Sequence, residues 1–174
     1  MLRHNKEGIK MKSPMEKLDE YFKKHKPALY LANNLGFTTY GQDHLDNVIV
    51  PRLENLGYEV IEPFTRNKPL INKYDGKKLA FEIALDNQKS MDRSEALVAI
   101  LDGTDVDSGV AAEIGYAYAL GGITINGYRN DFRKACIDEG ICDINLQVQF
   151  FVENSGGRIY NKLDNLVDAI RLNE

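Results

Sequence analysis

Short apolar runs alternate along the chain with longer stretches in which apolar residues recur every three or four positions. The short runs are typical of buried parallel strands, and the longer stretches are typical of helices that pack on them. Strands are predicted at 28–32, 58–63, 97–101, 123–128 and 158–160, and helices at 42–56, 77–92, 110–120 and 161–172. This alternation implies βαβ units with right-handed crossovers. We therefore expect a single-domain α/β fold, with a doubly wound, flavodoxin-like or Rossmann-like sheet of about five parallel strands.

Four segments within this pattern carry narrower predictions. Pro51 stands inside the 42–56 helix and should kink it or end it early. Residues 64–75 are too long for a plain connector and predict a binding loop. Residues 145–151 fit a helix or a strand, and we favour a helix because Ser155, Gly156 and Gly157 resemble a C-terminal stop. In the 77–92 helix, the residues expected to face inward are Leu79, Ile83, Ala84 and Leu85.

The first residues form a separate part of the pattern. Residues 1–26 predict an N-terminal extension with one short helix, which Ser13 can cap and Pro14 can begin. Residues 27–174 form the main domain.

Composition excludes several classes of function. The chain has 174 residues, a size that suits one domain, and its formal net charge of −4 favours neither nucleic acid nor an anionic membrane as a partner. No apolar run approaches the length of about 18 residues that would predict a membrane span, and the N-terminus lacks the apolar region of a signal peptide. Cys136 and Cys142 could form a disulfide or half of a metal site, but no second pair accompanies them. Reduced thiols and a cytoplasmic location are therefore expected.

Nucleotide-binding glycine motifs are missing from the positions where they would be needed. The sequence from Asn33 to Phe37, after the first predicted strand, does not fit G-x-G-x-x-G, and no G-x-x-x-x-G-K-[ST] motif occurs. This argues against dinucleotide binding and against a P-loop nucleotidase.

The segment from Leu97 to Gly121 is the most informative for chemistry. It runs from an apolar strand through an acidic turn into a helix that carries Glu113. Ligands of α/β proteins bind at the carboxyl ends of the strands, so Asp107 and Glu113 would flank one cleft. Two carboxylates in such a place are typical of glycosidic-bond chemistry.

Each of these acidic residues also has a plainer interpretation. Glu113 could simply be an acidic residue that the helix dipole stabilises near the N-terminus of the helix. Its small and apolar neighbours, however, indicate partial burial, which is costly for a charge. Asp107 could cap the helix. With Asp102 and Asp105 it could also bind a divalent metal, but the spacing does not fit an EF-hand loop. Asp86 could lie on a solvated face or point toward the strand ends.

These residues resemble a known family. The core Asp107-Ser108-Gly109-x-x-x-Glu113-x-Gly-Tyr-Ala is similar to the main motif of the nucleoside 2-deoxyribosyltransferases. Tyr30, Asp86-Asn87 and Asn145-Leu146 follow the order of that family, and the likeness covers about residues 28–170.

The resemblance implies an enzyme that transfers 2-deoxyribose between nucleobases, with no metal or organic cofactor. Glu113 would be the nucleophile that attacks C1′ of a deoxynucleoside and expels the base. Asp86 and Asp107 would bind the base and handle its proton, and Tyr30 would lie near the nucleophile. The candidate substrate-binding residues are Asn33, Phe37, Asp102, Ser108, Gly109, Asn145 and Gln147.

The resemblance also implies a homo-oligomer, a dimer or a multiple of dimers, with shared active sites. Asn145 would reach into a neighbouring subunit's site, and the apolar residues Val148, Phe150, Phe151 and Val152 could cover the contact. The alternative is that these residues only complete the core of the single chain. The small-molecule partners that the resemblance implies for the protein are a deoxynucleoside and a free nucleobase.

Two departures from the family leave the substrate open. Gln147 stands where well-known members have methionine, and the insert at 129–143 is long. One alternative is a hydrolase of 2′-deoxynucleoside 5′-monophosphates, in which Arg129, Arg133 or Ser108 would hold the phosphate. A non-catalytic nucleotide-binding module is a further alternative, against which Glu113 and the paired aspartates argue.

Overall fold

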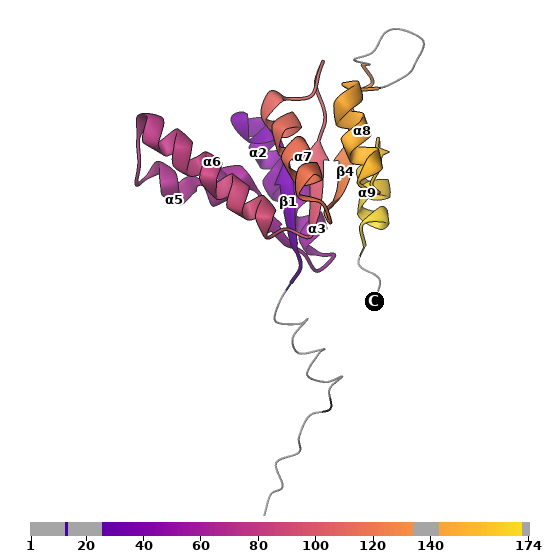
Figure 1. The fold of residues 1–174 in the computed structure, drawn as a ribbon, viewed down its shortest axis with the longest axis horizontal. Helices are drawn as coiled ribbons and strands as arrows, with labels where there is room; N and C mark the ends of the chain where they lie inside the picture. Colours follow the sequence, from indigo (N-terminus) through magenta and orange to yellow (C-terminus); the bar gives the residue numbers. More distant parts are fainter. Residues whose placement is uncertain (1–12, 14–25, 134–142, 172–174) are drawn as a thin grey trace, which may run out of the picture.

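Five parallel strands form one sheet in the order β2-β1-β3-β4-β5, with helices on both faces (Figure 1). This computed structural model describes residues 13, 26–133 and 143–171. The strands are β1 (Ala28–Ala32), β2 (Glu59–Ile61), β3 (Ala96–Ile100), β4 (Thr124–Tyr128) and β5 (Ile159–Tyr160). The helices are η1 (Leu35–Phe37), α2 (Thr39–His44), η2 (Leu45–Ile49), α3 (Val50–Glu54), α4 (Pro63–Arg66), α5 (Lys68–Ile71), α6 (Gly76–Asp92), α7 (Ser108–Leu120), α8 (Leu146–Asn154) and α9 (Leu163–Ala169). The predicted doubly wound α/β fold is confirmed.

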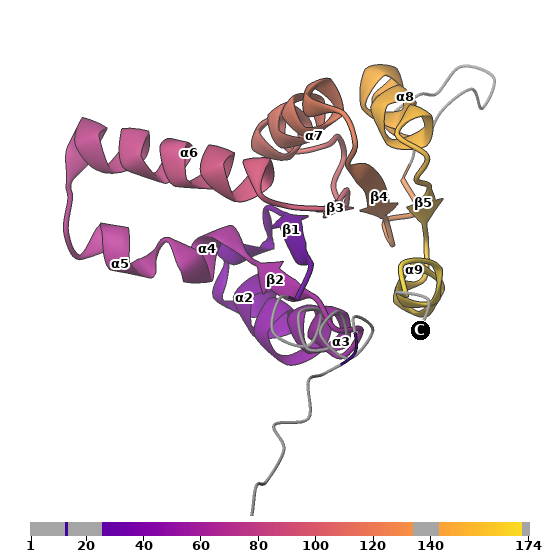
Figure 2. The same cartoon turned by 60° about the horizontal axis from the view of Figure 1, so that its bottom comes forward.

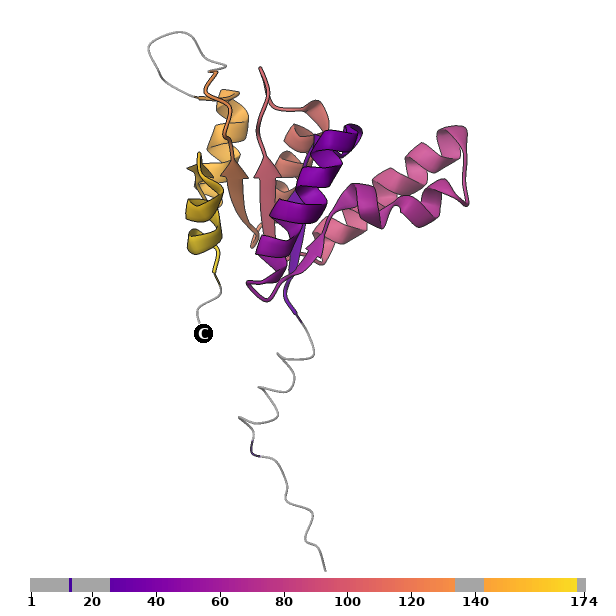
Figure 3. The same cartoon turned by 180° about the vertical axis from the view of Figure 1, so that it is seen from behind.

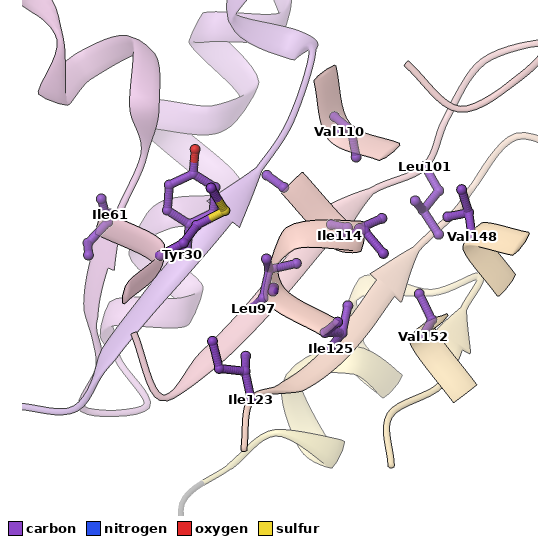
Figure 4. Packing of buried hydrophobic residues seen from close by; sticks show 14 of the residues in the cluster. Tyr30, Ile61, Leu97, Leu101, Val110, Ile114, Ile123, Ile125, Val148 and Val152 are labelled. Carbon is purple, nitrogen blue, oxygen red and sulfur yellow. The ribbon is translucent and has the colours of Figure 1, made fainter. Parts of the chain in front are cut away.

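Alternate residues of the central strands bury on opposite faces of the sheet. Tyr30, Leu97 and Ile125 pack with α7 and α8 on one face (Figure 4). Leu31 and Val98 pack on the other face with η2, α3 and α9, seen from behind in Figure 3. Because both faces are covered, the strands read as continuous apolar runs in the sequence.

The helix that follows β1 differs from its prediction at both ends. It begins at Thr39, where the Thr38 side chain accepts a hydrogen bond from the backbone N–H of Gly41, and it ends at Glu54. Pro51 does not end it, because the π-helical η2 directly precedes the turn that contains the proline. The backbone N–H of Val50 donates to the carbonyl of Leu45, so the chain passes the proline through a widened turn.

The predicted long loop at 64–75 is wrong. Most of it forms α4 and α5, and the Glu62 side chain caps α4 by accepting from the backbone N–H groups of Phe64 and Thr65. Pro63 then occupies the first helical position, where its missing N–H costs nothing.

The α6 helix projects from the sheet beside α5 as an arm, which Figures 1 and 2 show from two directions. Only Ser90 and Met91, near its C-terminal end, are buried. The inward packing predicted along this helix is therefore wrong: Leu79, Ile83 and Leu85 are only half-buried, and Ala84 is exposed.

The remaining elements agree with the sequence pattern to within a few residues. Residues 145–151 lie in or beside α8, as favoured, and Gly121 ends α7 with a positive φ of 71°. The predicted N-terminal helix, Cys136 and Cys142 lie outside the described residues.

Candidate active site

The candidate catalytic residues lie near the point between β1 and β3 where the order in which strands are added to the sheet reverses. The helices that follow β1 cover one face, and α7, which follows the neighbouring β3, covers the other. This is the switch point of a doubly wound sheet, where the carboxyl ends of the strands leave a place for ligands.

The start of α7 is fixed by Asp107. Its Oδ1 accepts hydrogen bonds from the backbone N–H of Gly109 at 2.8 Å and of Val110 at 3.2 Å. A Cβ at Gly109 would lie 3.0 Å from that oxygen, so glycine leaves room for the cap. The cap holds Asp107 at the mouth of the site and orients the helix that carries Glu113.

Glu113 and Tyr30 form the centre of the site. The Tyr30 hydroxyl donates to Glu113 Oε1 over 2.6 Å, although the residues are 83 positions apart in the sequence. The Tyr30 ring belongs to the buried cluster, and its hydroxyl lies at the edge of that cluster (Figure 4). Oε2 of Glu113 has no hydrogen-bond partner among the described residues, which leaves it for a ligand.

Burial and neighbouring charge set the ionisation of this pair. Burial raises the pKa of Glu113 from 4.5 to about 7; the hydrogen bond from Tyr30 opposes this rise, and the charge of Asp107 adds to it. Burial is also the main cause that raises the pKa of the Tyr30 hydroxyl, followed by Glu113, Glu62 and Asp86. Tyr30 therefore stays a donor, while Glu113 can change its charge near neutral pH.

Glu62 is a buried carboxylate that the sequence did not single out. It accepts hydrogen bonds from the Asn33 side chain at 3.0 Å and, as the α4 cap, from two backbone N–H groups. Asn33 is also buried, and its Oδ1 accepts from the backbone of Gly36. The two residues join the ends of β1 and β2. Pro63 was the available signal, because proline favours the first helical position, which makes the residue before it the cap.

Asp86 lies on α6 at the base of the arm, where it pairs with Arg66 of α4. Arg66 Nε lies 2.7 Å from Asp86 Oδ2, and Arg66 Nη2 lies 3.4 Å from Oδ1. The side chain of Asp86 is 27% exposed. Its carboxylate therefore lies against α4, and its charge is the last of the causes that raise the pKa of the Tyr30 hydroxyl, after burial, Glu113 and Glu62.

Asp102 and Arg129 join the turn after β3 to the turn after β4. Asp102 Oδ1 accepts from the backbone N–H groups of Asn130 and Asp131 at 2.6 and 2.8 Å. The buried Arg129 guanidinium donates to the carbonyls of Leu101, Gly103 and Arg133. Both side chains thus hold protein backbone in this structure.

The other candidate binding residues lie on exposed positions around the strand ends. Ser108, Gly109, Asn145 and Gln147 are exposed, and Asn145 caps α8 by accepting from the backbone of Gln147 and Val148. Phe37 is 75% exposed and meets Phe64 edge to face at 4.8 Å between ring centroids. The structure brings none of these five into hydrogen-bond contact with Glu113.

Two cavities lie apart from this chemistry. One of about 1030 Å³ opens beside β5 and α9, and one of about 390 Å³ opens beside β2. Neither is lined by Tyr30, Asp86 or Glu113. We place the candidate site by its carboxylates, because hollow shape alone says nothing about reactivity.

The described part of the chain holds no group of three or more histidine, cysteine or acidic residues arranged to bind a metal ion. No helix in that part is long and apolar enough to cross a membrane. The groups present are a half-buried carboxylate, a tyrosine donor and flanking acids. They suit attack on an electrophilic carbon and hydrogen bonding to a polar ring.

The family model for nucleoside 2-deoxyribosyltransferase matches residues 29–159. No curated protein sequence matches the chain.

Three solved structures share the fold. A conserved protein from Enterococcus faecalis is 26% identical, with a TM-score of 0.64, over 83% of this chain and 96% of its own. A 2-deoxyribosyltransferase from Bacillus psychrosaccharolyticus is 18% identical, with a TM-score of 0.63, over 81% and 90%. The CMP N-glycosidase of Clostridium botulinum is 18% identical, with a TM-score of 0.50, over 82% and 96%.

Proposed function

The chain belongs to the nucleoside 2-deoxyribosyltransferase family, and from that premise we propose that it transfers 2-deoxyribose between nucleobases through an ester on Glu113. The observation that carries the proposal is the hydrogen bond between Tyr30 and Glu113 at the switch point of the sheet. It holds one carboxylate oxygen and leaves the other available to attack.

The reaction has two displacements at C1′ of the sugar. Glu113 Oε2 attacks C1′ as the C1′–N bond breaks, and the electron pair of that bond leaves with the base. The carboxylate stabilises the oxocarbenium-like transition state and becomes the leaving group of the second step. A second base then attacks C1′, which frees Glu113 and restores the β-configuration.

The environment of Glu113 supports this role. Attack requires the ionised carboxylate, and burial raises the pKa of Glu113 to about 7. The Tyr30 hydrogen bond favours the ionised form, so it keeps the nucleophile available near neutral pH. A partly desolvated carboxylate is also a stronger partner for a developing positive charge.

We assign the base to the acids beside the nucleophile, in agreement with the family resemblance. Asp107 uses Oδ1 as a helix cap, and Oδ2 is left to meet the base. Asp86 forms the other wall, with its carboxylate against Arg66. Asn33, Phe37, Asp102, Ser108, Gly109 and Gln147 remain candidate binding residues around this core.

Hydrolysis of a 2′-deoxynucleoside 5′-monophosphate is the second candidate, and the similarity in fold to a CMP N-glycosidase is the observation that favours it. Such an enzyme needs cationic groups for the phosphate. Arg129 is committed to three backbone carbonyls, and Arg133 pairs with Asp131. The proposal therefore favours a nucleoside without phosphate.

We also propose a cytoplasmic homo-oligomer with shared sites, acting in nucleotide salvage. Asn145 is exposed and so can reach a neighbouring subunit. Val148 and Val152 are buried within the chain itself, whereas Phe150 is 50% exposed and remains available for a contact. The domain boundary at residues 26 and 27 stays a prediction.

The test is release and exchange of bases. The purified protein is incubated with a 2′-deoxynucleoside, with and without a second free base, and products are separated by chromatography. We expect a new deoxynucleoside only when the second base is present. Free base and deoxyribose at the same rate in both samples would establish hydrolysis instead. Preference for the 5′-monophosphate would support the second candidate.

A further inference from the structure

The cavity of about 1030 Å³ lies at the β5 edge of the sheet and is separate from the candidate active site. Residues of α8, β5 and α9 line it, and Figure 2 shows these three elements at the same end of the molecule. The cavity also reaches the residues that follow β4. It therefore opens at the carboxyl ends of two neighbouring strands, where α/β proteins bind ligands. Its volume is at the upper end of the usual range for small-molecule sites.

Two arginines of this cavity lack the acidic partners that the other arginines have. Seven arginines lie in the described part of the chain, and five of them pair with an aspartate or a glutamate: Arg52, Arg66, Arg93, Arg133 and Arg171. The other two, Arg129 and Arg158, form no ion pair with a described residue, and both line the cavity. The unpaired guanidinium groups of the described chain are therefore gathered at one place.

Arg129 is the buried one of the two. It is 4% exposed, and its guanidinium donates to the backbone carbonyls of Leu101, Gly103 and Arg133, while its Nε has no hydrogen-bond partner. Carbonyl oxygens satisfy N–H donors but do not neutralise the charge. Because a buried charge without a counter-charge is costly, this wall of the cavity favours an anion.

Arg158 and Lys162 extend the positive wall. Arg158 directly precedes β5, and Lys162 directly precedes α9. Both side chains are exposed, and neither forms a hydrogen bond or an ion pair within the described chain. Their N–H groups are therefore available to a ligand in the cavity.

Three carboxylates share the cavity with these cations. Asp131 pairs with Arg133, and Glu153 accepts a hydrogen bond from the Gln149 side chain over 2.9 Å. Asp143 is the third acidic side chain of the lining. Four cationic side chains thus meet three acidic ones, although the whole chain has a net charge of −4. One of those three acids is already held by an arginine, so the cations are in excess.

We propose that this cavity binds the phosphoryl group of a small phosphate ester. Arg158 and Lys162 donate to the phosphoryl oxygens, and the uncompensated charge of Arg129 lies behind them. A phosphoryl group brings about two negative charges and three acceptor oxygens, which guanidinium and ammonium groups bind well. The volume leaves room for the organic part of the ester beside β5. Neither Tyr30 nor Glu113 lines the cavity, so this site is independent of the proposed reaction.

The experiment is isothermal titration calorimetry of the full-length protein with three separate probes: ribose 5-phosphate, inorganic phosphate and ribose. We expect saturable binding of ribose 5-phosphate, weaker binding of inorganic phosphate, and none of ribose. Arg158→Gln and Lys162→Gln should each weaken the binding of ribose 5-phosphate about tenfold, because each removes a charged hydrogen bond. Added NaCl should weaken it as well, since the attraction is between charges near the surface.

Arg93→Gln and Lys89→Gln are the matched controls. Each removes the same charge as one of the test variants from an exposed position outside the cavity. Both should leave the affinity unchanged. Substitutions at exposed positions of this kind change stability little, so all four variants should fold, which thermal unfolding can check.

Four outcomes would overturn the inference. No saturable binding of ribose 5-phosphate at millimolar concentration would remove the site. Affinity that survives both Arg158→Gln and Lys162→Gln would place the bound phosphate elsewhere. Equal losses in the control variants would reduce the effect to net charge. Equal affinities for inorganic phosphate and ribose 5-phosphate would rule out an ester as the preferred ligand.

Discussion

Replacement of Glu113 by glutamine should abolish turnover and, above neutral pH, make the protein more stable. Burial raises the pKa of Glu113 from 4.5 to about 7. In this window the folded state binds more protons than the unfolded state, so stability falls as pH rises from about 4.5 to 7. Below the window Glu113 is protonated in both states and has no such effect.

The magnitude follows from that shift. At about 1.4 kcal/mol for each pKa unit, ionisation of Glu113 costs the fold at most about 3.5 kcal/mol. Glutamine keeps the shape and an oxygen that can accept from Tyr30, but it carries no charge to desolvate. For a chain of this size, a gain of that order corresponds to an increase in Tm of roughly 7–14 °C at pH 8.

The assay is urea unfolding of wild type and Glu113→Gln at pH 4, 6 and 8, alongside measurement of activity. The free energies of unfolding should be nearly equal at pH 4 and should diverge at pH 6 and 8, with the variant more stable. A difference that does not change with pH would refute the argument, as would a variant that is less stable at pH 8. Residual activity above about a tenth of wild type would refute the nucleophile, since covalent catalysis supplies several powers of ten.

Three further predictions concern the pH profile, the sugar and the assembly. In Tyr30→Phe the hydrogen bond that lowers the pKa of Glu113 is lost, so the rising limb of kcat/KM against pH should move to higher pH; an unmoved limb would contradict this. Deoxyadenosine should be preferred over adenosine by at least about tenfold in kcat/KM, because a 2′-hydroxyl withdraws electrons from the cationic transition state and crowds Glu113; equal values would oppose it. A mixture of inactive Glu113→Ala and inactive Asn145→Ala proteins should recover activity if each site takes residues from two chains, whereas a monomer by light scattering would exclude a shared site.

The sequence predicted the sheet well because buried parallel strands leave a clear trace. Runs such as 28–32 and 97–101 are apolar throughout, and each lies within one residue of its strand. The projection of α6 as an arm could not be predicted in this way. Leu79 and Ile83 have the spacing of a packed helix, but apolar spacing does not state what covers a face, and α6 extends past the sheet.

Local chemistry also decided two elements that the apolar pattern missed. Glu62 and Pro63 start α4 through a cap and a preset φ, within a segment interpreted as a loop. Pro51 is tolerated because a π turn precedes it, a detail that depends on backbone geometry rather than on residue type.

For the candidate site, the sequence identified residues but not their partners. The motif around Glu113 indicated the acids at 107 and 113, and Tyr30 came from order along the chain. Contacts between distant residues were invisible, and the pairing of Asp86 with Arg66 is the main example. Asp102 is another example, since the sequence marked this acidic turn but gave no sign that Asp102 Oδ1 accepts from two backbone N–H groups.

Direct detection of the ester on Glu113 tests the central claim. The wild-type protein is mixed with a 2′-deoxynucleoside without a second base, quenched in acid within a turnover, digested and analysed by mass spectrometry. The account predicts that the peptide containing Glu113 gains the mass of one deoxyribosyl group, that a second base added before the quench removes it, and that Glu113→Gln never acquires it. Release of base by an active wild type with no adduct on that peptide, or with an adduct on another residue, would contradict it.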